Sequence, residues 1–360
     1  RFRDGRPAPD MHLSPMIHTE YVDNFVSLSQ TEAPVRIAAV AAGAALNAAG
    51  LPTHDVEWSV GGETLGWAFD SDKPTVSVSL GTLWKIKLGI EHLLERGFCT
   101  GAELRVIVAH FTMRALMRRE LLSCLYAVYH FIQRNEHRRA KLWSSVVREL
   151  QWCSSLLCLA KRDLGAQWCE DVLAVDASPW GRGAVRARPS VAVIREMGRV
   201  NERWRFSKDS ERKVLPRQNA FEYDELAVQA DLGWEKNPFP EIPTAVWNGE
   251  WSRVESRKWN RAEAMPVLEG RVLVWSVRHI ARKVGNHGLR HLIINDSLAP
   301  VSSLSKGRSS TPGMCRVCRQ WASTCLTADL YAAVRWLPSE RNPADNASRA
   351  KAGDAAAHGA

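Results

Sequence analysis

Short apolar runs that lead directly to a carboxylate are the clearest pattern in the second half of the chain. The run 172–175 is followed by Asp176, and the run 291–295 is followed by Asp296. Apolar runs of this length, bounded by turn residues, predict buried strands. An Asp that only caps a turn explains either residue taken alone. Two acids in matching contexts predict that the strands end near each other in an α/β domain.

Further periodic segments surround these two strands. Alternation over 191–206 predicts one or two strands, and the polar, proline-containing region 207–258 predicts an insertion or a partly disordered segment, because it exceeds ordinary loop lengths. Pro266 opens an apolar helix over about 267–283, since proline is tolerated in the first turn. The remaining elements predicted are helices over 298–304 and 312–328, a strand over 331–337, and a loop that leads to Asp345.

The first half combines a hairpin pattern with helical periodicity. β-Branched and aromatic residues on both sides of Asp23 and Asn24 predict a β-hairpin over 17–28 with Asp23 at its tip. An apolar stripe within a second long helix places Arg118 and Arg119 on or near the other side. The other elements predicted are a helix over 34–49, a short β region over 56–69, helices over 83–133 broken at Gly97 and Gly101, and an amphipathic segment over 141–159.

Positive charge is concentrated in two segments of this 360-residue chain, whose formal net charge is +9. Residues 85–149 hold 12 Lys and Arg against 6 Asp and Glu, and residues 271–351 hold 13 against 4. Two basic segments in a folded protein favour a polyanionic partner, nucleic acid first. Simple solubilising charge explains the same counts and stays open as the alternative.

Composition argues against several other classes of protein. The eight dispersed cysteines lack the spacing of a disulfide scaffold, and Cys315 and Cys318 have no second ligand pair for zinc. No apolar run reaches membrane-spanning length and no signal peptide is evident, so we expect an intracellular protein of the cytoplasm or nucleus that is not secreted. Because the chain begins at Arg1, we expect an N-terminal part of a longer protein to be missing.

A helix near the middle of the second half offers another acid. Glu263 and Glu269 are both candidates, because they lie on either side of Pro266. Glu269 is favoured, since Pro266 places it inside the first helical turn and an apolar helix face follows it. Together with Asp176, Asp296 and Asp345 it makes a set of four candidate site residues.

Sequence motifs surround these acids at 175–178 with Gly181 and Gly183, 267–269, 294–296, 306–310 and 336–349. Together they resemble the RNase H domain of retroelement reverse transcriptases over about residues 170–350. The last motif is the most specific and is similar to the end of RNase H domains in retrotransposons of the tyrosine-recombinase-type group. In that group the Asp after Asn-Pro-Ala is the final metal ligand, and this position is Asp345 here.

The resemblance implies a two-Mg²⁺ ribonuclease that cuts the RNA strand of an RNA–DNA hybrid. Asp176 would bridge the ions, Glu269 and Asp296 would complete one site, and Asp345 would join Asp176 at the other. Such hydrolysis passes through a highly charged transition state, which two hard cations held by carboxylate oxygens stabilise. Without cations the four acids would repel one another, which argues against a metal-free structural role. Lys306 and Arg308 are candidates for phosphate contacts, with a solvated face as the alternative.

Residues 21–24 read Tyr-Val-Asp-Asn and resemble the Tyr-x-Asp-Asp hairpin of the reverse-transcriptase palm. The resemblance implies a polymerase remnant at Tyr21, Asp23 and Asn24, followed by a basic thumb in which Arg118 and Arg119 bind nucleic acid. Asn24 stands where the family has a second Asp, which removes one charged metal ligand. The short segment before Tyr21 also lacks the strand that carries the family's first catalytic Asp. We therefore expect this chain alone not to polymerise DNA.

These patterns predict a multidomain protein of mixed α+β and α/β class. The expected parts are a partial palm at 1–80, a helical thumb and connection at 81–165, an RNase H-like domain with a mixed sheet flanked by helices at 166–350, and a loose tail at 351–360. The leading functional hypothesis is the nuclease. The second is a degenerate retroelement relic that binds nucleic acid without cutting it, and the third is a non-nuclease α/β domain with fortuitous acids.

Overall fold

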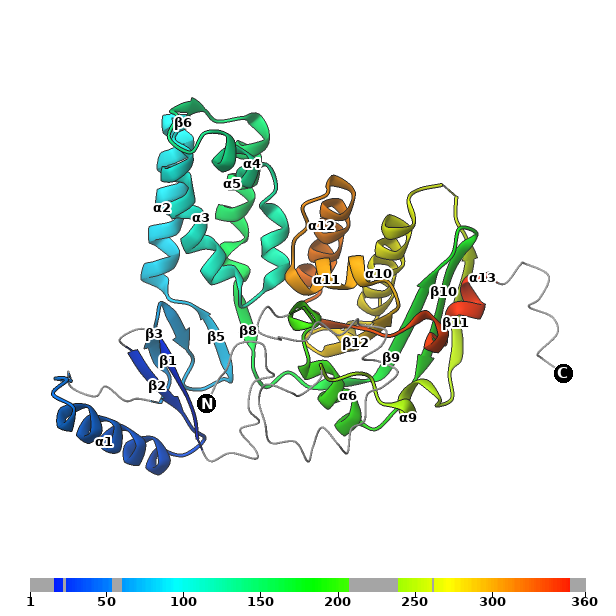
Figure 1. Ribbon diagram of the computed structural model, residues 1–360, viewed down its shortest axis with the longest axis horizontal. Coiled ribbons are helices and arrows are strands. Elements are labelled where there is room, and N and C mark those ends of the chain that lie inside the picture. The colour runs from blue at the N-terminus through cyan, green and yellow to red at the C-terminus, as the bar shows by residue number, and fades with distance from the viewer. Residues whose placement is uncertain (1–15, 22–23, 54–59, 207–238, 261, 350–360) are drawn as a thin grey trace.

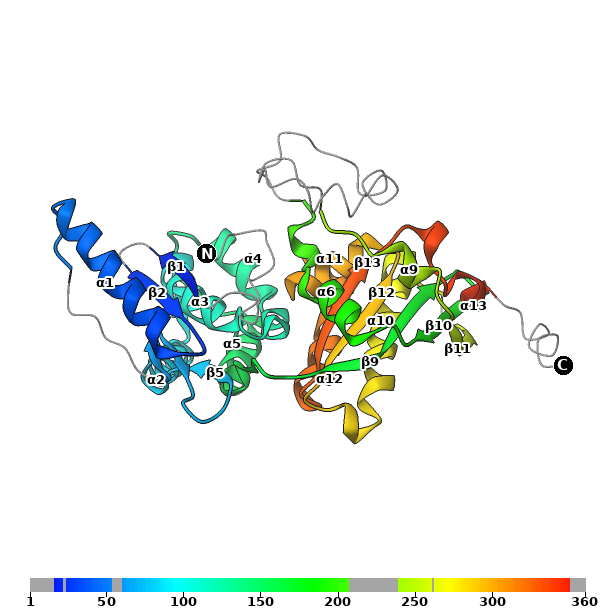
Figure 2. The same cartoon turned by 90° about the horizontal axis from the view of Figure 1, so that it is seen from below.

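The chain folds into a helix-rich first half and a second half that is built on one large sheet (Figures 1 and 2). Its helices and sheets make it a protein of mixed α and β class, as the sequence predicts. The predicted tail, 351–360, lies outside the described residues. The computed structural model describes residues 16–21, 24–53, 60–206, 239–260 and 262–349.

A five-stranded mixed sheet with the order β11-β10-β9-β12-β13 organises the second half. The pairs β9/β10 and β10/β11 are antiparallel, whereas β12 runs parallel to both β9 and β13. Since β9 and β12 are parallel, the acids at their ends reach the same edge of the sheet. The strands are β9 Trp168–Ala177, β10 Gly181–Ala187, β11 Ser252–Lys258, β12 Arg290–Asn295 and β13 Tyr331–Trp336.

Helices cover both faces of this sheet. Successive side chains of β9 point to opposite faces, so this strand contributes apolar residues to the cores on both sides. Leu173 and Val175 join the core under α10 and α12, whereas Val172 and Ala174 join the core under α6 and α9. The helices are α6 Val191–Arg199, α9 Thr244–Trp247, α10 Met265–Ala281, α11 Leu298–Lys306, α12 Pro312–Thr327 and α13 Asp345–Arg349, with 3-10 turns at Glu202–Trp204, Val284–Asn286 and Ser339–Arg341.

The predicted strands over 191–206 are wrong, because the segment forms α6 and a 3-10 turn. The hydroxyl of Ser190 accepts a hydrogen bond from the Val193 N–H, and Ile194 and Met197 are buried at helical spacing. The third strand of the sheet is β11 instead, within the region 207–258 that was predicted to be an insertion. Most of its residues are polar, so no apolar run marks this edge strand.

The first half begins with the predicted hairpin, formed by β1 Ile17–Tyr21 and β2 Asn24–Leu28 in antiparallel register. Its tip residue Asp23 lies outside the described residues. The predicted helix near 34–49 is α1 Glu32–Ala48. The break at Gly97 is confirmed by a φ of 73° at the end of α2 Leu80–Arg96.

Two small sheets and a helical core complete this half. Its other strands are β3 Gly62–Thr64, β4 Trp67–Phe69, β5 Thr75–Val78, β6 Phe98–Cys99, β7 Ala140–Lys141 and β8 Lys161–Asp163. Its other helices are α2 Leu80–Arg96, α3 Gly101–Ala115, α4 Ala127–Arg134 and α5 Ser144–Leu156, with 3-10 turns at Arg119–Cys124 and Leu157–Leu159.

The long second helix predicted for this half is interrupted, and this changes the environment of Arg118. The chain leaves α3 after Ala115 and turns Arg118 into the junction with the second half, where the residue is 2% exposed. Its guanidinium donates to Asp329 Oδ1 at 2.7 Å and lies 4.7 Å from the centre of the Tyr331 ring. Arg118 is therefore buried inside the protein and does not lie on the outer side of a helix, and nucleic-acid binding by this residue stays a prediction that its burial does not favour.

Other polar contacts cross the same junction. Arg319 of α12 donates to Glu149 Oε1 of α5 at 2.6 Å and to the Ser123 carbonyl at 3.1 Å. Gly307 packs so closely that a Cβ there would lie 1.9 Å from the Arg119 carbonyl oxygen. The two halves therefore meet through a tight, hydrogen-bonded interface.

A glycine contact between β10 and α13 generates a stability prediction. A Cβ on Gly183 would lie 2.3 Å from the Ser348 amide nitrogen, so Gly183→Ala should displace α13 and lower the free energy of unfolding by about 1–3 kcal/mol in urea titrations. Gly285→Ala is the matched control, because a Cβ there meets no atom within 4 Å. Equal stability of the two variants would contradict the predicted contact.

Candidate metal centre

Three acids from separate elements meet at one edge of the large sheet. Asp176 comes from the end of β9, Glu269 from α10, and Asp296 directly follows β12. One carboxylate oxygen from each lies within 4.8 Å of the other two. Residues separated by up to 120 positions in sequence thus form one compact cluster of oxygen atoms.

Asn295 links the elements that carry this cluster through hydrogen bonds of its side chain. The sequence analysis does not single it out as a site residue. Its fully buried side chain donates to the Val175 carbonyl at 3.0 Å and to Glu269 Oε2 at 3.2 Å. It therefore links β9, β12 and α10 at the point where their acids meet. An amide at the end of an apolar strand, next to an acid, is the sequence signal that points to this role.

The two glutamates considered near Pro266 have different surroundings. Glu269 is 7% exposed and belongs to the acid cluster. Glu263 lies before the helix and pairs with Arg271, whose Nη2 donates to Glu263 Oε1 at 2.8 Å. The geometry thus brings Glu269, the favoured candidate, to Asp176 and Asp296.

Asp345 lies near this cluster without joining the group of three. It begins α13, is half-buried, and pairs with Arg349 at 2.7 Å. Ser178 Oγ donates to the Ser348 carbonyl at 2.7 Å, which ties α13 to the turn after β9. Asp345 is close enough to raise the pKa of Asp176 electrostatically.

Burial and mutual repulsion favour protonation of two of the acids. Burial, with the negative charges of Asp296 and Asp345, raises the pKa of Asp176 to about 7. Burial, with the charges of Asp296 and Asp176, raises the pKa of Glu269 to about 9. The cluster therefore lacks enough positive charge from the protein to hold all its carboxylates ionised at neutral pH.

The donor set fits a hard divalent cation. Asp296 Oδ1 is buried and has no hydrogen-bond partner within the described residues. A buried oxygen without a partner is costly, and a cation removes that cost. All the offered ligand atoms are carboxylate oxygens, which Mg²⁺, Ca²⁺ and Mn²⁺ prefer over nitrogen and sulfur.

The remaining predicted site residues lie apart from the cluster. Lys306 is exposed at the end of α11, and Arg308 is exposed and donates to the Tyr129 hydroxyl at 2.9 Å. Arg119 is half-buried at the junction of the two halves. Tyr21 and Asn24 pair at the end of the hairpin.

Two further observations concern the zinc site and the membrane span that the sequence argues against. Cys315 and Cys318 are buried residues of α12. Neither belongs to a cluster of metal-ligating side chains in the described part of the chain. Within the same residues, no helix combines the length and apolar character required to cross a bilayer.

Comparison with known proteins gives only a distant likeness. No protein-family model matches the chain, and no curated protein matches it. Among solved structures, a foamy viral protease-reverse transcriptase in complex with an RNA/DNA hybrid is similar at a TM-score of 0.29 and 11% identity. The match covers 89% of this chain and 56% of the viral chain, so this chain spans little more than half of that protein. A likeness of this size carries no argument about function.

The raised pKa of Glu269 generates a prediction for metal-free protein. The folded protein keeps this proton up to about pH 9, whereas the unfolded chain loses it near 4.5. The stabilising contribution of the protonated form is thus complete below pH 4.5 and is lost as pH rises to 9. Chemical denaturation in EDTA should show the free energy of unfolding falling by up to about 1.4 kcal/mol per pH unit in this window, with a flatter profile for Glu269→Gln. Parallel profiles for the two proteins would contradict this titration.

Proposed function

We propose that the chain is a metal-dependent nuclease of the RNase H type, part of a retroelement reverse transcriptase, that hydrolyses the RNA strand of RNA–DNA hybrids. The observation that carries the proposal is the meeting of Asp176, Glu269 and Asp296 with ligand oxygens within 4.8 Å. The buried Oδ1 of Asp296, which has no hydrogen-bond partner among the described residues, supports a cation as its partner. The sequence motifs around these acids support the RNase H type.

The four acids would divide the work of holding two Mg²⁺ ions. Asp176 lies in the cluster and near Asp345, which suits a ligand shared between two sites. Glu269 and Asp296 would complete one site, and Asp345 would leave Arg349 to complete the other. When bound, paired Mg²⁺ ions activate water at neutral pH and stabilise charge on the leaving oxygen. Asn295 would keep Glu269 oriented toward the ions through its hydrogen bond.

An RNA–DNA hybrid fits the charge distribution of the chain. Lys306 and Arg308 are exposed at the end of α11 and just after it, where they can approach phosphates. The 2′-hydroxyl distinguishes the RNA strand from DNA and would select the strand to be cut. Arg119 is a further candidate contact, whereas Arg118 would act inside the protein.

The first half would be a remnant of the polymerase. The hairpin of β1 and β2 suits the palm hairpin that Tyr21, Asp23 and Asn24 resemble. Asn24 replaces a charged ligand, so we expect no DNA synthesis by this chain alone. The helices α2 to α5 would serve as thumb and connection.

A cleavage assay tests the proposal. Wild-type protein should cut a labelled RNA–DNA hybrid in Mg²⁺ and leave it intact in EDTA. Asp176→Asn should lower the cleavage rate by at least about 100-fold, because it removes charge that holds the ions at the reacting phosphate. Glu263→Gln is the control and should retain activity, since Glu263 pairs with Arg271 outside the acid cluster.

The same assay separates the nuclease from a relic that only binds. Intact hybrid with wild-type protein, together with tight binding in a gel-shift titration, would favour the relic. Intact hybrid and no binding would favour an α/β domain unrelated to nucleic acid. Cleavage that is unchanged by Asp176→Asn would place the nuclease centre elsewhere.

Neutralising the basic end of α11 tests the substrate surface. The double variant Lys306→Gln/Arg308→Gln should lower the slope of log K against log salt by about 2 if each side chain contacts one phosphate. Arg278→Gln is a control of the same charge type, because Arg278 is exposed near the opposite end of α10 from Glu269. An unchanged slope in the double variant would show that Lys306 and Arg308 are solvated charges only.

A further inference from the structure

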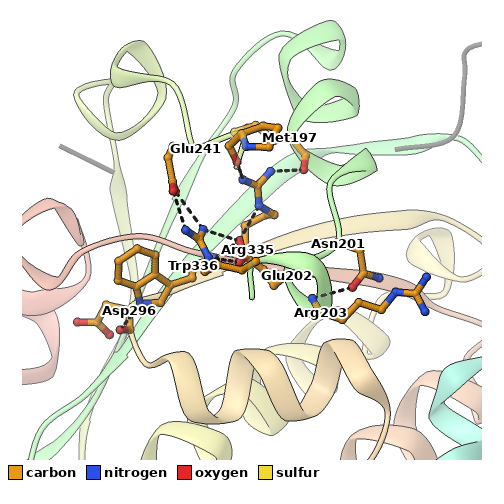
Figure 3. Close-up of polar contacts among 10 residues, drawn as sticks. Met197, Asn201, Glu202, Arg203, Glu241, Asp296, Arg335 and Trp336 are labelled. Carbon is orange, nitrogen blue, oxygen red and sulfur yellow. Dashed lines mark hydrogen bonds and ion pairs between the residues drawn. The ribbon is translucent and has the colours of Figure 1, made fainter. Parts of the chain in front are cut away.

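Four charged side chains form a buried network beside β13 (Figure 3). Glu202 accepts from Arg335 Nε at 2.9 Å and from Arg205 Nε at 2.6 Å. Arg205 also pairs with Glu241 at 2.6 Å, and all four side chains are at most 3% exposed. Two acids and two guanidinium groups thus compensate one another away from water.

Two backbone carbonyl groups accept further hydrogen bonds from the Arg335 guanidinium. Its Nη1 donates to the Met197 carbonyl at 2.7 Å, and its Nη2 donates to the Pro240 carbonyl. The network therefore joins α6, the 3-10 turn after it, the segment before α9, and β13. Buried ion pairs contribute little net stability but strongly disfavour alternative arrangements of the chain, because each broken pair leaves a buried charge.

One residue of β13 connects this network to the acid cluster. The Trp336 N–H donates to Glu202 Oε1 at 3.0 Å, and the Arg205 guanidinium lies 4.7 Å from the centre of the Trp336 ring. At the edge of the same ring, Trp336 Nε1 donates to the Asp296 carbonyl at 2.7 Å. Figure 3 shows this continuous path from Glu202 through Trp336 to Asp296.

The last contact matters because Asp296 has left the β12 ladder. Asn295 is the last residue of β12 that pairs with β13, and it pairs with Trp336 itself. The peptide after Asp296 is fixed by the indole hydrogen bond at the position where the side chain must turn toward Asp176 and Glu269. The indole thus holds the backbone carbonyl of the same residue whose carboxylate belongs to the acid cluster.

We propose that Trp336 is a positioning residue for the metal centre, and that Glu202 and Arg205 hold it in the orientation that the Asp296 carbonyl requires. The inference deepens the proposed function, because it assigns a supporting shell to one ligand of that same site. Hydrogen-bond partners that orient metal ligands commonly change metal affinity by about 10-fold or more when they are removed. The role differs from simple core packing, which would change stability without changing cation affinity.

Trp336→Phe tests the inference, since it keeps an aromatic ring beside Arg205 and removes the indole donor. Isothermal titration with Mn²⁺ should show about 10-fold weaker binding than wild type. Hybrid cleavage should lose rate at low Mg²⁺ and recover much of it at saturating Mg²⁺. Trp251→Phe is the matched control, because Trp251 Nε1 donates to the Val246 carbonyl at 3.3 Å within the same domain. It should leave Mn²⁺ affinity unchanged.

Arg205→Lys is the second variant, and it keeps a positive charge between Glu202 and Glu241. It removes the planar group over the Trp336 ring and should also weaken Mn²⁺ binding. Near-UV circular dichroism identifies which variants are folded, and wild-type Mn²⁺ affinity in either folded variant would overturn the inference. Equal weakening by Trp251→Phe would overturn it too, since the effect would then be general.

The outcomes separate this inference from the proposed function. Wild-type protein that binds Mn²⁺ but cuts no hybrid would end the nuclease proposal, and weaker Mn²⁺ binding by Trp336→Phe would still support the positioning role. A hybrid-cutting enzyme whose Mn²⁺ affinity is unaffected by Trp336→Phe would retain the proposed function without the positioning role. Wild-type protein that binds no Mn²⁺ would end both.

Discussion

Repulsion among buried carboxylates is the constraint that the second half of the fold must overcome. Asp176, Glu269 and Asp296 lie together although burial and mutual charge raise the pKa of Asp176 and of Glu269. The parallel pairing of β12 with β9 brings two of them to one edge, and α10 brings the third. Packing of apolar residues over both faces of the sheet provides the favourable free energy that keeps these elements in place.

The two groups of acids have opposite electrostatic surroundings, and their pKa values shift in opposite directions. Burial alone would raise the pKa of Glu202, but Arg335 and Arg205 lower it below its usual value. No cation pairs with Glu269 among the residues that the structure describes, and the pKa of Glu269 is raised. Glu202 is therefore ionised within a closed network, whereas the raised pKa values of Glu269 and Asp176 favour a bound proton, and their cluster could hold a cation instead. This contrast distinguishes a structural charge from a group that is available for chemistry.

Local patterns made part of this architecture predictable. The strands before Asp176 and Asp296 and the helix after Pro266 are marked by apolar runs and by proline, so their acids could be found from sequence. The β11 strand was missed because its partner β10 is more than 60 residues away and its own residues are mostly polar. The burial of Arg118 was missed for a similar reason, since Asp329 lies 211 positions later. Periodicity reports which side of an element is apolar, and it does not report which charges find partners.

The junction around Arg118 limits how the halves can move. Bending one half away from the other would separate Arg118 from Asp329 and Arg319 from Glu149, and would leave the buried guanidinium of Arg118 without its partner. Such a hinge is energetically unfavourable, so the helical half and the large sheet should tumble and respond to load as one body. The span from the helices α2 to α5 to the acid cluster is then a fixed length of the molecule.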